Sequence, residues 1–160
     1  MVRRLVGLVI FGAASGVLIT AVMQTWSGIL HGDWLVNAAV IGLGVSATSA
    51  LVIGLAALIG PPGIGVAAII TLLIANPIAG AGAPPQFLPE PWGEVGRWFV
   101  PGASATLLRS VMYFPDAATA AQWAVLAAWL VVGVALALVG HHRTRAELSP
   151  PPEQLDRVTA

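Results

Sequence analysis

The segment that organises this chain is Asn76–Phe114, which reads NPIAGAGAPPQFLPEPWGEVGRWFVPGASATLLRSVMYF. It holds Glu90, Glu94, Arg97 and Arg109, whereas the stretches on either side are almost free of charge. The whole sequence is 58% hydrophobic and 9% charged, with a mean hydropathy of +0.89. A water-soluble domain carries about 25% charged residues. The composition therefore indicates an integral membrane protein.

Four uncharged stretches flank this segment and are predicted to cross the ~30 Å hydrocarbon core of a bilayer as helices. They are Leu5–Met23, Leu35–Ile59, Ile64–Ala79 and Ala117–Val139. A cleaved signal peptide is the alternative for the first stretch, although its apolar run is longer than a signal peptide needs.

Residues 90–114 are predicted to form two short amphipathic helices separated by a break at Pro101 and Gly102. Neither helix is long enough to span a bilayer, which favours an interfacial or re-entrant hairpin. We therefore predict an all-α polytopic membrane protein with four transmembrane helices and an extracytoplasmic amphipathic helical hairpin before the last span. The transmembrane domain would comprise residues 1–145, and residues 146–160 would form a polar tail.

Arginines near the membrane ends predict the topology. Arg3 and Arg4 precede the first span, and Arg143 and Arg145 follow the last. Four spans place both ends on one side, so both termini are expected in the cytoplasm. Lysine is absent, and the excess of Ala, Gly and Val suggests a GC-rich bacterial genome. The expected location is the bacterial plasma membrane.

Small residues recur at helical spacing in the first two spans. Gly12 and Gly16 form a small-xxx-small pair, and Gly42, Ser46 and Ser49 fall at i, i+4 and i+7. In lipid such stripes are normally helix-packing faces. Chance in a glycine-rich chain is the alternative for the first pair. Because lipid fills such faces poorly, we expect a homo- or hetero-oligomer with another membrane subunit.

Polar residues of the central segment are candidates for structural or partner contacts. Pro77 frees a backbone carbonyl near the end of the third span, and Asn76 either satisfies that backbone or contacts a ligand. Glu94 and Arg97 are spaced to pair along a helix. Arg109, on one face with Tyr113, either anchors at lipid headgroups or pairs with Glu94 or Glu90 to lock the hairpin over the bundle.

Several classes of function are excluded by the residues that are missing. Without lysine there is no P-loop, without cysteine there is no thiolate chemistry, and the spans hold no ionisable group for proton coupling. The pairs His31–Asp33 and His141–His142 lack further ligands nearby, so they favour a solvated turn and a headgroup-facing basic end over metal sites. A net charge of zero argues against nucleic acid. We expect no enzyme activity, no cofactor and no metal.

The order of motifs in the second half resembles the C-terminal part of type-2 ABC exporter permeases, in particular the YhgE/Pip-like branch. The motifs are Asn76–Pro77, Leu88–Trp92, Gly96–Ala103, Thr106–Ser110 and Tyr113–Phe114. The resemblance is clearest over Asn76–Gly140. In that family two short extracytoplasmic helices lie between the fifth and sixth spans, so the four spans here would correspond to the last four of six.

This resemblance implies a permease-like membrane subunit of an ABC-type exporter, without its own ATPase and truncated at the N-terminus. It would assemble with another membrane chain and a separate ATPase. The family's first two spans, large extracytoplasmic domain and cytoplasmic coupling helix have no counterpart here, so the chain would be a split permease half or a degenerate remnant. The alternative is a non-transporting membrane scaffold or accessory protein that binds a partner through its outer hairpin.

Overall fold

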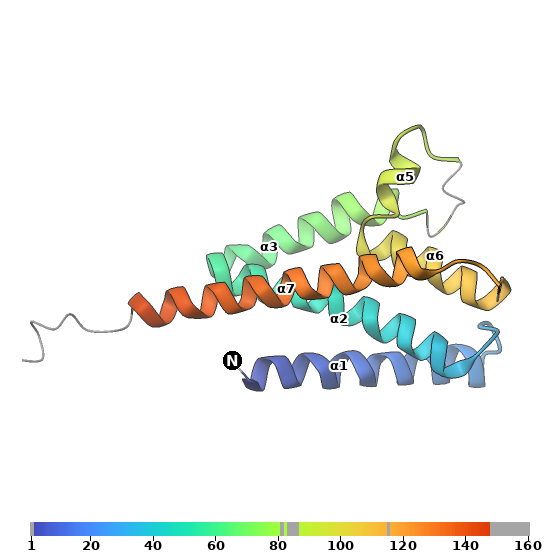
Figure 1. Ribbon diagram of the computed structural model, residues 1–160, viewed down its shortest axis with the longest axis horizontal. Coiled ribbons are helices and arrows are strands. Elements are labelled where there is room, and N and C mark those ends of the chain that lie inside the picture. The colour runs from blue at the N-terminus through green and yellow to red at the C-terminus, as the bar shows by residue number, and fades with distance from the viewer. Residues whose placement is uncertain (1, 81, 83–86, 115, 148–160) are drawn as a thin grey trace, which may run out of the picture.

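The computed structural model describes residues 2–80, 82, 87–114 and 116–147, and these residues form helices and turns without a strand (Figure 1). Three helices are long and apolar enough, by length and composition, to cross a membrane: Arg3–Trp26, Trp34–Ile59 and Ala120–His142. They lie where the first, second and last predicted spans were expected. The all-helical prediction is therefore confirmed in the described part of the chain.

The elements follow one another with short connections. Helix α1 (Val2–Thr20) continues into the π-helix η1 (Ala21–Trp26), and α2 (Trp34–Ile59) follows. Next come α3 (Pro62–Ala68), the π-helix η2 (Ile69–Ala75) and α4 (Asn76–Ile78), which together form one rod of 17 residues that we call the α3–α4 rod. The chain ends with α5 (Trp92–Gly96), α6 (Val100–Tyr113) and α7 (Ala120–Glu147).

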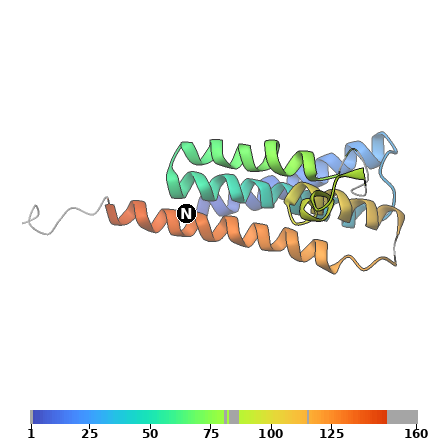
Figure 2. The same ribbon diagram turned by 90° about the horizontal axis from the view of Figure 1, so that it is seen from above.

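Helix α2 lies at the centre of the bundle. It contacts α1, α3, α6 and α7, and its contact with α7 is the most extensive in the described chain. Figures 1 and 2 show α1 and α3 antiparallel to α2, with α7 parallel to it. A helix that is apolar all round is either buried in a protein core or spans a membrane. Helix α2 has this composition, since its few polar residues are Ser, Thr and one Asn, and 39% of its most apolar window is buried inside the bundle.

Glycines allow the helices to approach closely. A Cβ added to Gly16 would overlap the carbonyl oxygen of Ala38 on α2, and one added to Gly54 would overlap that of Gly133 on α7. Hydrophobic burial supplies little driving force between helices in lipid, so such backbone contacts supply van der Waals attraction instead. The small residues therefore determine how the bundle packs.

The last helix differs from the prediction at both ends. It begins at Ala120 instead of Ala117 and continues to Glu147, past the expected end at Val139. Gly140 lies within this extended helix, and a Cβ added there would overlap the backbone of Ala57 on α2. Gly140 therefore serves as a packing residue within the helix.

The break before α6 also lies elsewhere than predicted. Helix α5 ends at Gly96, and α6 begins at Val100, so Pro101 and Gly102 lie inside the first turn of α6. Proline suits the first turn because its missing N–H has no helical partner there. Helix α6 packs against α2 and α7, and its Leu107 is completely buried together with Ala103. This helix thus belongs to the core, with Val40, Ala47 and Leu126 as neighbours in the same cluster.

Candidate functional site

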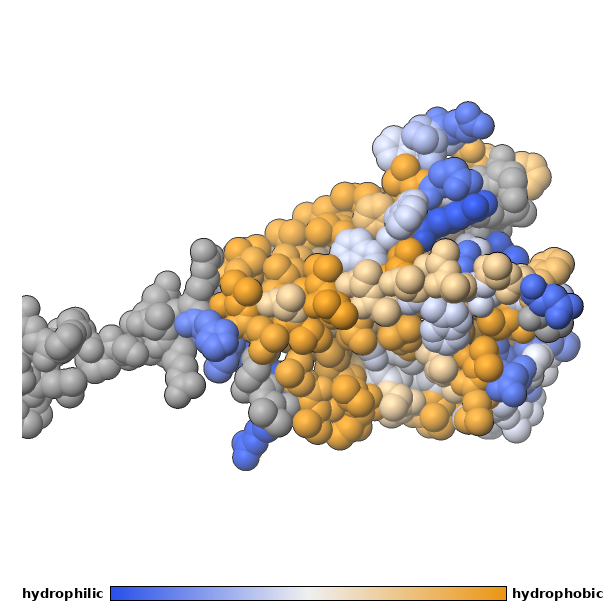
Figure 3. All heavy atoms as spheres, in the orientation of Figure 1, coloured by the Kyte–Doolittle hydropathy of each residue, from blue (hydrophilic) through white to orange (hydrophobic). Residues whose placement is uncertain are grey.

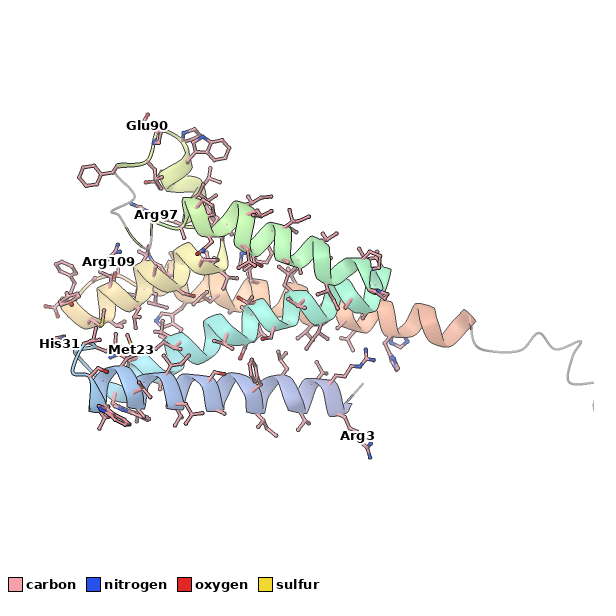
Figure 4. All side chains as sticks on the ribbon, turned by 180° about the vertical axis from the view of Figure 1, so that it is seen from behind. Arg3, Met23, His31, Glu90, Arg97 and Arg109 are labelled. Atoms are coloured by element: carbon pink, nitrogen blue, oxygen red, sulfur yellow. The ribbon has the colours of Figure 1, made fainter. Side chains whose placement is uncertain are left out.

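Polar and aromatic side chains gather at one end of the molecule. Figure 3 shows the larger group of hydrophilic residues around α5 and α6, a smaller group at the opposite end, and an apolar middle of the bundle. In Figure 4, Glu90, Arg97, Arg109 and His31 lie at this end, and Arg3 lies at the other. Large aromatic side chains are also exposed here: Phe87, Trp92, Trp98, Tyr113 and Phe114. Such aromatics are typical of a membrane–water interface. We call this region the polar end.

Glycines fix the position of α5 at the polar end. An added Cβ on Gly96 would overlap the carbonyl oxygen of Ile78, at the end of the α3–α4 rod. One on Gly102 would overlap the carbonyl oxygen of Gly96 and lie 3.3 Å from the Cα atom of Ala79. The backbones of the rod, α5 and α6 are therefore in direct contact. This contact holds the short helix α5 in place, although five residues alone would not form a stable helix.

A groove of about 690 Å³ lies between α5 and α7. Its floor is mostly alanine and valine from α7, and its polar residues are Glu94, Arg97 and Gln122. The indole Nε1 of Trp129 donates a 2.7 Å hydrogen bond to the carbonyl oxygen of Trp98, which ties the turn after α5 to α7. The Trp129 ring also stacks on Phe99, with ring centroids 5.9 Å apart. We call this cavity the α5–α7 groove.

Glu94 and Arg97 form an ion pair at the groove. Arg97 Nη1 lies 3.3 Å from Glu94 Oε1, and the two side chains are 40% and 73% exposed. A solvent-exposed pair of this kind contributes about 0–1 kcal/mol to stability. Arg97 Nε and Gln122 Oε1 are buried and have no hydrogen-bond partner within the described residues. The groove therefore has a mixed donor and acceptor character at its polar part.

Arg109 contacts the backbone. Its Nη2 donates a 3.4 Å hydrogen bond to the carbonyl oxygen of Gly80, just after the α3–α4 rod. Within the described part of the chain, the carboxylate of Glu94 pairs with Arg97 and none pairs with Arg109. The pairing of Arg109 with Glu94 or Glu90, one of the two alternatives for this arginine, is thus not present among the described residues.

The remaining candidates are spread over several elements. Asn76 and Pro77 are exposed in α4, directly after the wide turns of η2, and the Asn76 carbonyl accepts from Ala79 N at 3.3 Å. Tyr113 is exposed, with its ring centroid 6.2 Å from that of His31. Ser49 lines a smaller groove between α2 and α6. None of these residues is among those that line the α5–α7 groove with Glu94 and Arg97.

The small-residue pairs of the first two spans face each other within the chain. An added Cβ on Gly12 would overlap Ser46 Oγ and would lie 3.1 Å from the carbonyl oxygen of Gly42. The Ser46 hydroxyl itself donates a 2.7 Å hydrogen bond to the Gly42 carbonyl. This face is therefore filled by α1 against α2, and a second subunit would need a different face.

Sequence reasoning missed a polar cluster between η1 and α2. The Asn37 amide is completely buried, and its Nδ2 donates to Gln24 Oε1 at 2.9 Å and to the His31 carbonyl at 2.8 Å. Thr20, also completely buried, lies one helical turn before Gln24. The presence of Asn37 could have indicated this cluster, because an amide inside an otherwise apolar span must find hydrogen-bond partners within the protein.

Comparison with known protein families, with curated proteins and with solved structures gives no match for this chain. Among the described residues, no group of three or more His, Cys, Asp or Glu side chains is placed to hold a metal ion.

Proposed function

We propose that the protein is a non-catalytic, multi-pass subunit of a bacterial plasma-membrane assembly that binds a partner through the polar end. Four spans are proposed, the α3–α4 rod being the third. The main observation behind the proposal is that close backbone contacts fix the position of α5. Gly96 and Gly102 hold it against the rod and α6, and Trp92 and Phe87 remain exposed. Exposed aromatic residues on a preorganised backbone are typical anchors of protein interfaces.

The arrangement of the chain ends supports the orientation. The start of α1 and the end of α7 lie at the end of the bundle opposite the polar end (Figure 1). Arginines accompany both of these ends, and arginine-rich ends remain in the cytoplasm. The polar end then faces the outside of the cell, where it would meet an extracytoplasmic or membrane partner.

A second candidate function is that of a permease-like subunit of an ABC-type exporter, driven by a separate ATPase. It is favoured by a groove of about 400 Å³ between α2 and α6, which Thr48, Ser49 and Ser104 line. The Ser104 hydroxyl is buried and has no partner within the described residues. This groove between α2 and α6 would form part of a transport path only when a further membrane chain closes it.

Partner binding is tested by purification from native membranes in mild detergent, with identification of the co-purifying chains. Trp92→Ser is expected to lose the partner while the protein remains folded. Trp26→Ser is the matched control, since Trp26 is a more exposed indole at the end of η1, and η1 lies at the same end of the bundle (Figure 1). A partner lost equally in both variants would mean that the tryptophans act only as membrane anchors. Recovery of an ATPase and a second permease chain would favour the exporter.

A further inference from the structure

We propose that the α5–α7 groove binds one phospholipid of the leaflet at the polar end, which is the outer leaflet in the orientation proposed above, with an amine-bearing zwitterionic headgroup such as phosphatidylethanolamine. The acyl chain would lie along α7, and the headgroup would contact Glu94 and Arg97. This site is separate from Trp92, which the proposed partner contact uses, and it requires no second protein.

The length of the groove floor favours a lipid over a partner helix. Ala121, Val125, Ala128 and Val132 follow one another at spacings of three or four residues, so they form one stripe along α7. At a rise of about 1.5 Å per residue, this stripe is about 16 Å long. One leaflet of a ~30 Å hydrocarbon core is about as thick. A partner's transmembrane helix would need a contact face of about twice that length.

The polar groups lie at one end of the stripe only. Gln122 is in the first turn of α7, and Glu94 and Arg97 come from α5 and the turn after it. From there the floor is apolar as far as Val132, near the middle of the helix. An amphiphile with one polar group and an extended apolar tail matches this distribution. The exposed Trp98 indole beside the polar group suits headgroup depth.

The charges at the polar part specify the headgroup. The Arg97 guanidinium approaches Glu94 through Nη1, and its Nε has no hydrogen-bond partner within the described residues, so the group retains donors for a phosphate. The Glu94 carboxylate, 73% exposed, retains acceptor capacity for an ammonium group. A purely anionic headgroup would meet the carboxylate without an ammonium to offset the repulsion. A choline headgroup carries the charge but has no N–H to donate, which leaves ethanolamine as the best match.

Lipid binding is tested on the purified full-length chain by native mass spectrometry. Phosphatidylethanolamine, phosphatidylcholine and phosphatidylglycerol with identical acyl chains are added separately, and bound lipid is measured as a function of concentration. The parent is expected to retain one phosphatidylethanolamine with about tenfold higher affinity than the other two lipids, which is the size of one charge-assisted hydrogen bond. Equal affinity for all three lipids would overturn the headgroup assignment.

Filling the groove tests its location. Ala128→Trp is expected to abolish retention of this lipid, whereas Ala127→Trp should retain it, because Ala127 is exposed and does not line the groove. Ala124→Leu is a smaller obstruction for the case that Ala128→Trp fails to fold, and it should weaken binding. If Ala128→Trp or Ala124→Leu folds and still binds phosphatidylethanolamine as the parent does, the groove is not the binding site. A cross-link from position 128 to a second protein, in place of lipid, would also overturn the assignment.

Changing the polar residues tests the headgroup contacts. Glu94→Gln should reduce the preference for phosphatidylethanolamine over phosphatidylcholine to about twofold or less, while binding of the tail persists. Arg97→Gln should weaken binding of all three lipids, since each carries a phosphate. If Glu94→Gln kept the full preference for phosphatidylethanolamine over phosphatidylcholine, the contact between Glu94 and the ammonium group would be contradicted. Partner recovery is measured separately on the same variants. A variant that loses lipid binding but keeps the partner would bear on the groove alone, and the proposed partner contact would stand.

Discussion

The side-chain amide of Asn37 donates to the side-chain carbonyl of Gln24 across 2.9 Å, joining the first turn of α2 to the π-helix η1. Gln24 in turn donates from Nε2 to the Gly32 carbonyl at 2.9 Å, and Asp33 caps α2 by accepting from Val36 N at 2.9 Å. The connection between the first two long helices is therefore held by side chains, at the level where the chain reverses direction.

Replacing Asn37 with leucine is expected to lower the free energy of unfolding by about 1 kcal/mol. The change leaves Gln24 Oε1 and the His31 carbonyl without their donor, and interhelical hydrogen bonds in membrane proteins contribute about 0.6–1.7 kcal/mol. Unfolding in mixed micelles with increasing denaturing detergent measures the difference. Asn76→Leu is the control, since Asn76 is exposed. Equal losses in the two variants would show that the Asn37 contacts contribute nothing specific.

Replacing Gly16 with alanine is expected to destabilise the monomer by about 1–3 kcal/mol, because the new Cβ overlaps the Ala38 backbone and forces α1 away from α2. Gly7→Ala provides the comparison, since a Cβ at Gly7 meets nothing within 4 Å. That variant should be neutral or up to about 1 kcal/mol more stable through helix propensity. Thermal unfolding in detergent measures both. A normal melting temperature for Gly16→Ala, together with weakened cross-linking between subunits, would instead place this face at an interface.

The charges of Glu94 on α5 and Arg109 on α6 are expected to act independently of one another. In a double-mutant cycle, Glu94 and Arg97 should couple by about 0.2–0.5 kcal/mol, the value for an exposed pair at i, i+3. Glu94 and Arg109 should show no coupling, because Arg109 donates to the Gly80 carbonyl. Glu94→Arg should therefore fail to rescue Arg109→Glu. Rescue would instead support the alternative that Arg109 on α6 forms an ion pair with Glu94 on α5.

Reporter fusions test the orientation. Fusions after Gly32, Pro62, Pro89 and Arg145 are expected to report outside, inside, outside and inside, because the arginine-rich ends remain in the cytoplasm. The α3–α4 rod is the decisive element, since it is shorter than the other three apolar helices. An inside signal after Pro89 would mean that the rod does not cross the membrane.

The long helices were predictable because uncharged runs of about 20 residues carry a strong signal. Their boundaries were not, since they depend on contacts between distant residues. Asp33 caps α2, whereas Asp116 lies in a turn before α7, which begins only at Ala120. Gly140 lies inside α7, where it packs against Ala57 of α2.

The candidate site was predictable to a smaller extent. The spacing of Glu94 and Arg97 indicates their ion pair, and the apolar face of α6 follows from the positions of Leu107 and Val111. An amphipathic pattern does not say whether its apolar face meets lipid or protein, and here Leu107 faces the core. The α5–α7 groove joins residues from two separate helices, and nothing in the local sequence of either one predicts it.

The contact between α2 and α7, which are far apart in the sequence, has a consequence for the insertion of the protein into the membrane. During synthesis α2 enters the membrane long before α7 exists, so the face of α2 around Ala50 and Gly54, which Gly133 later covers, first meets lipid or the insertion machinery. A ribosome stalled before Ala120 would present this small-residue face uncovered. We expect such intermediates to be the form that membrane chaperones and quality-control proteases recognise, and arrival of the last helix to release the chain from both.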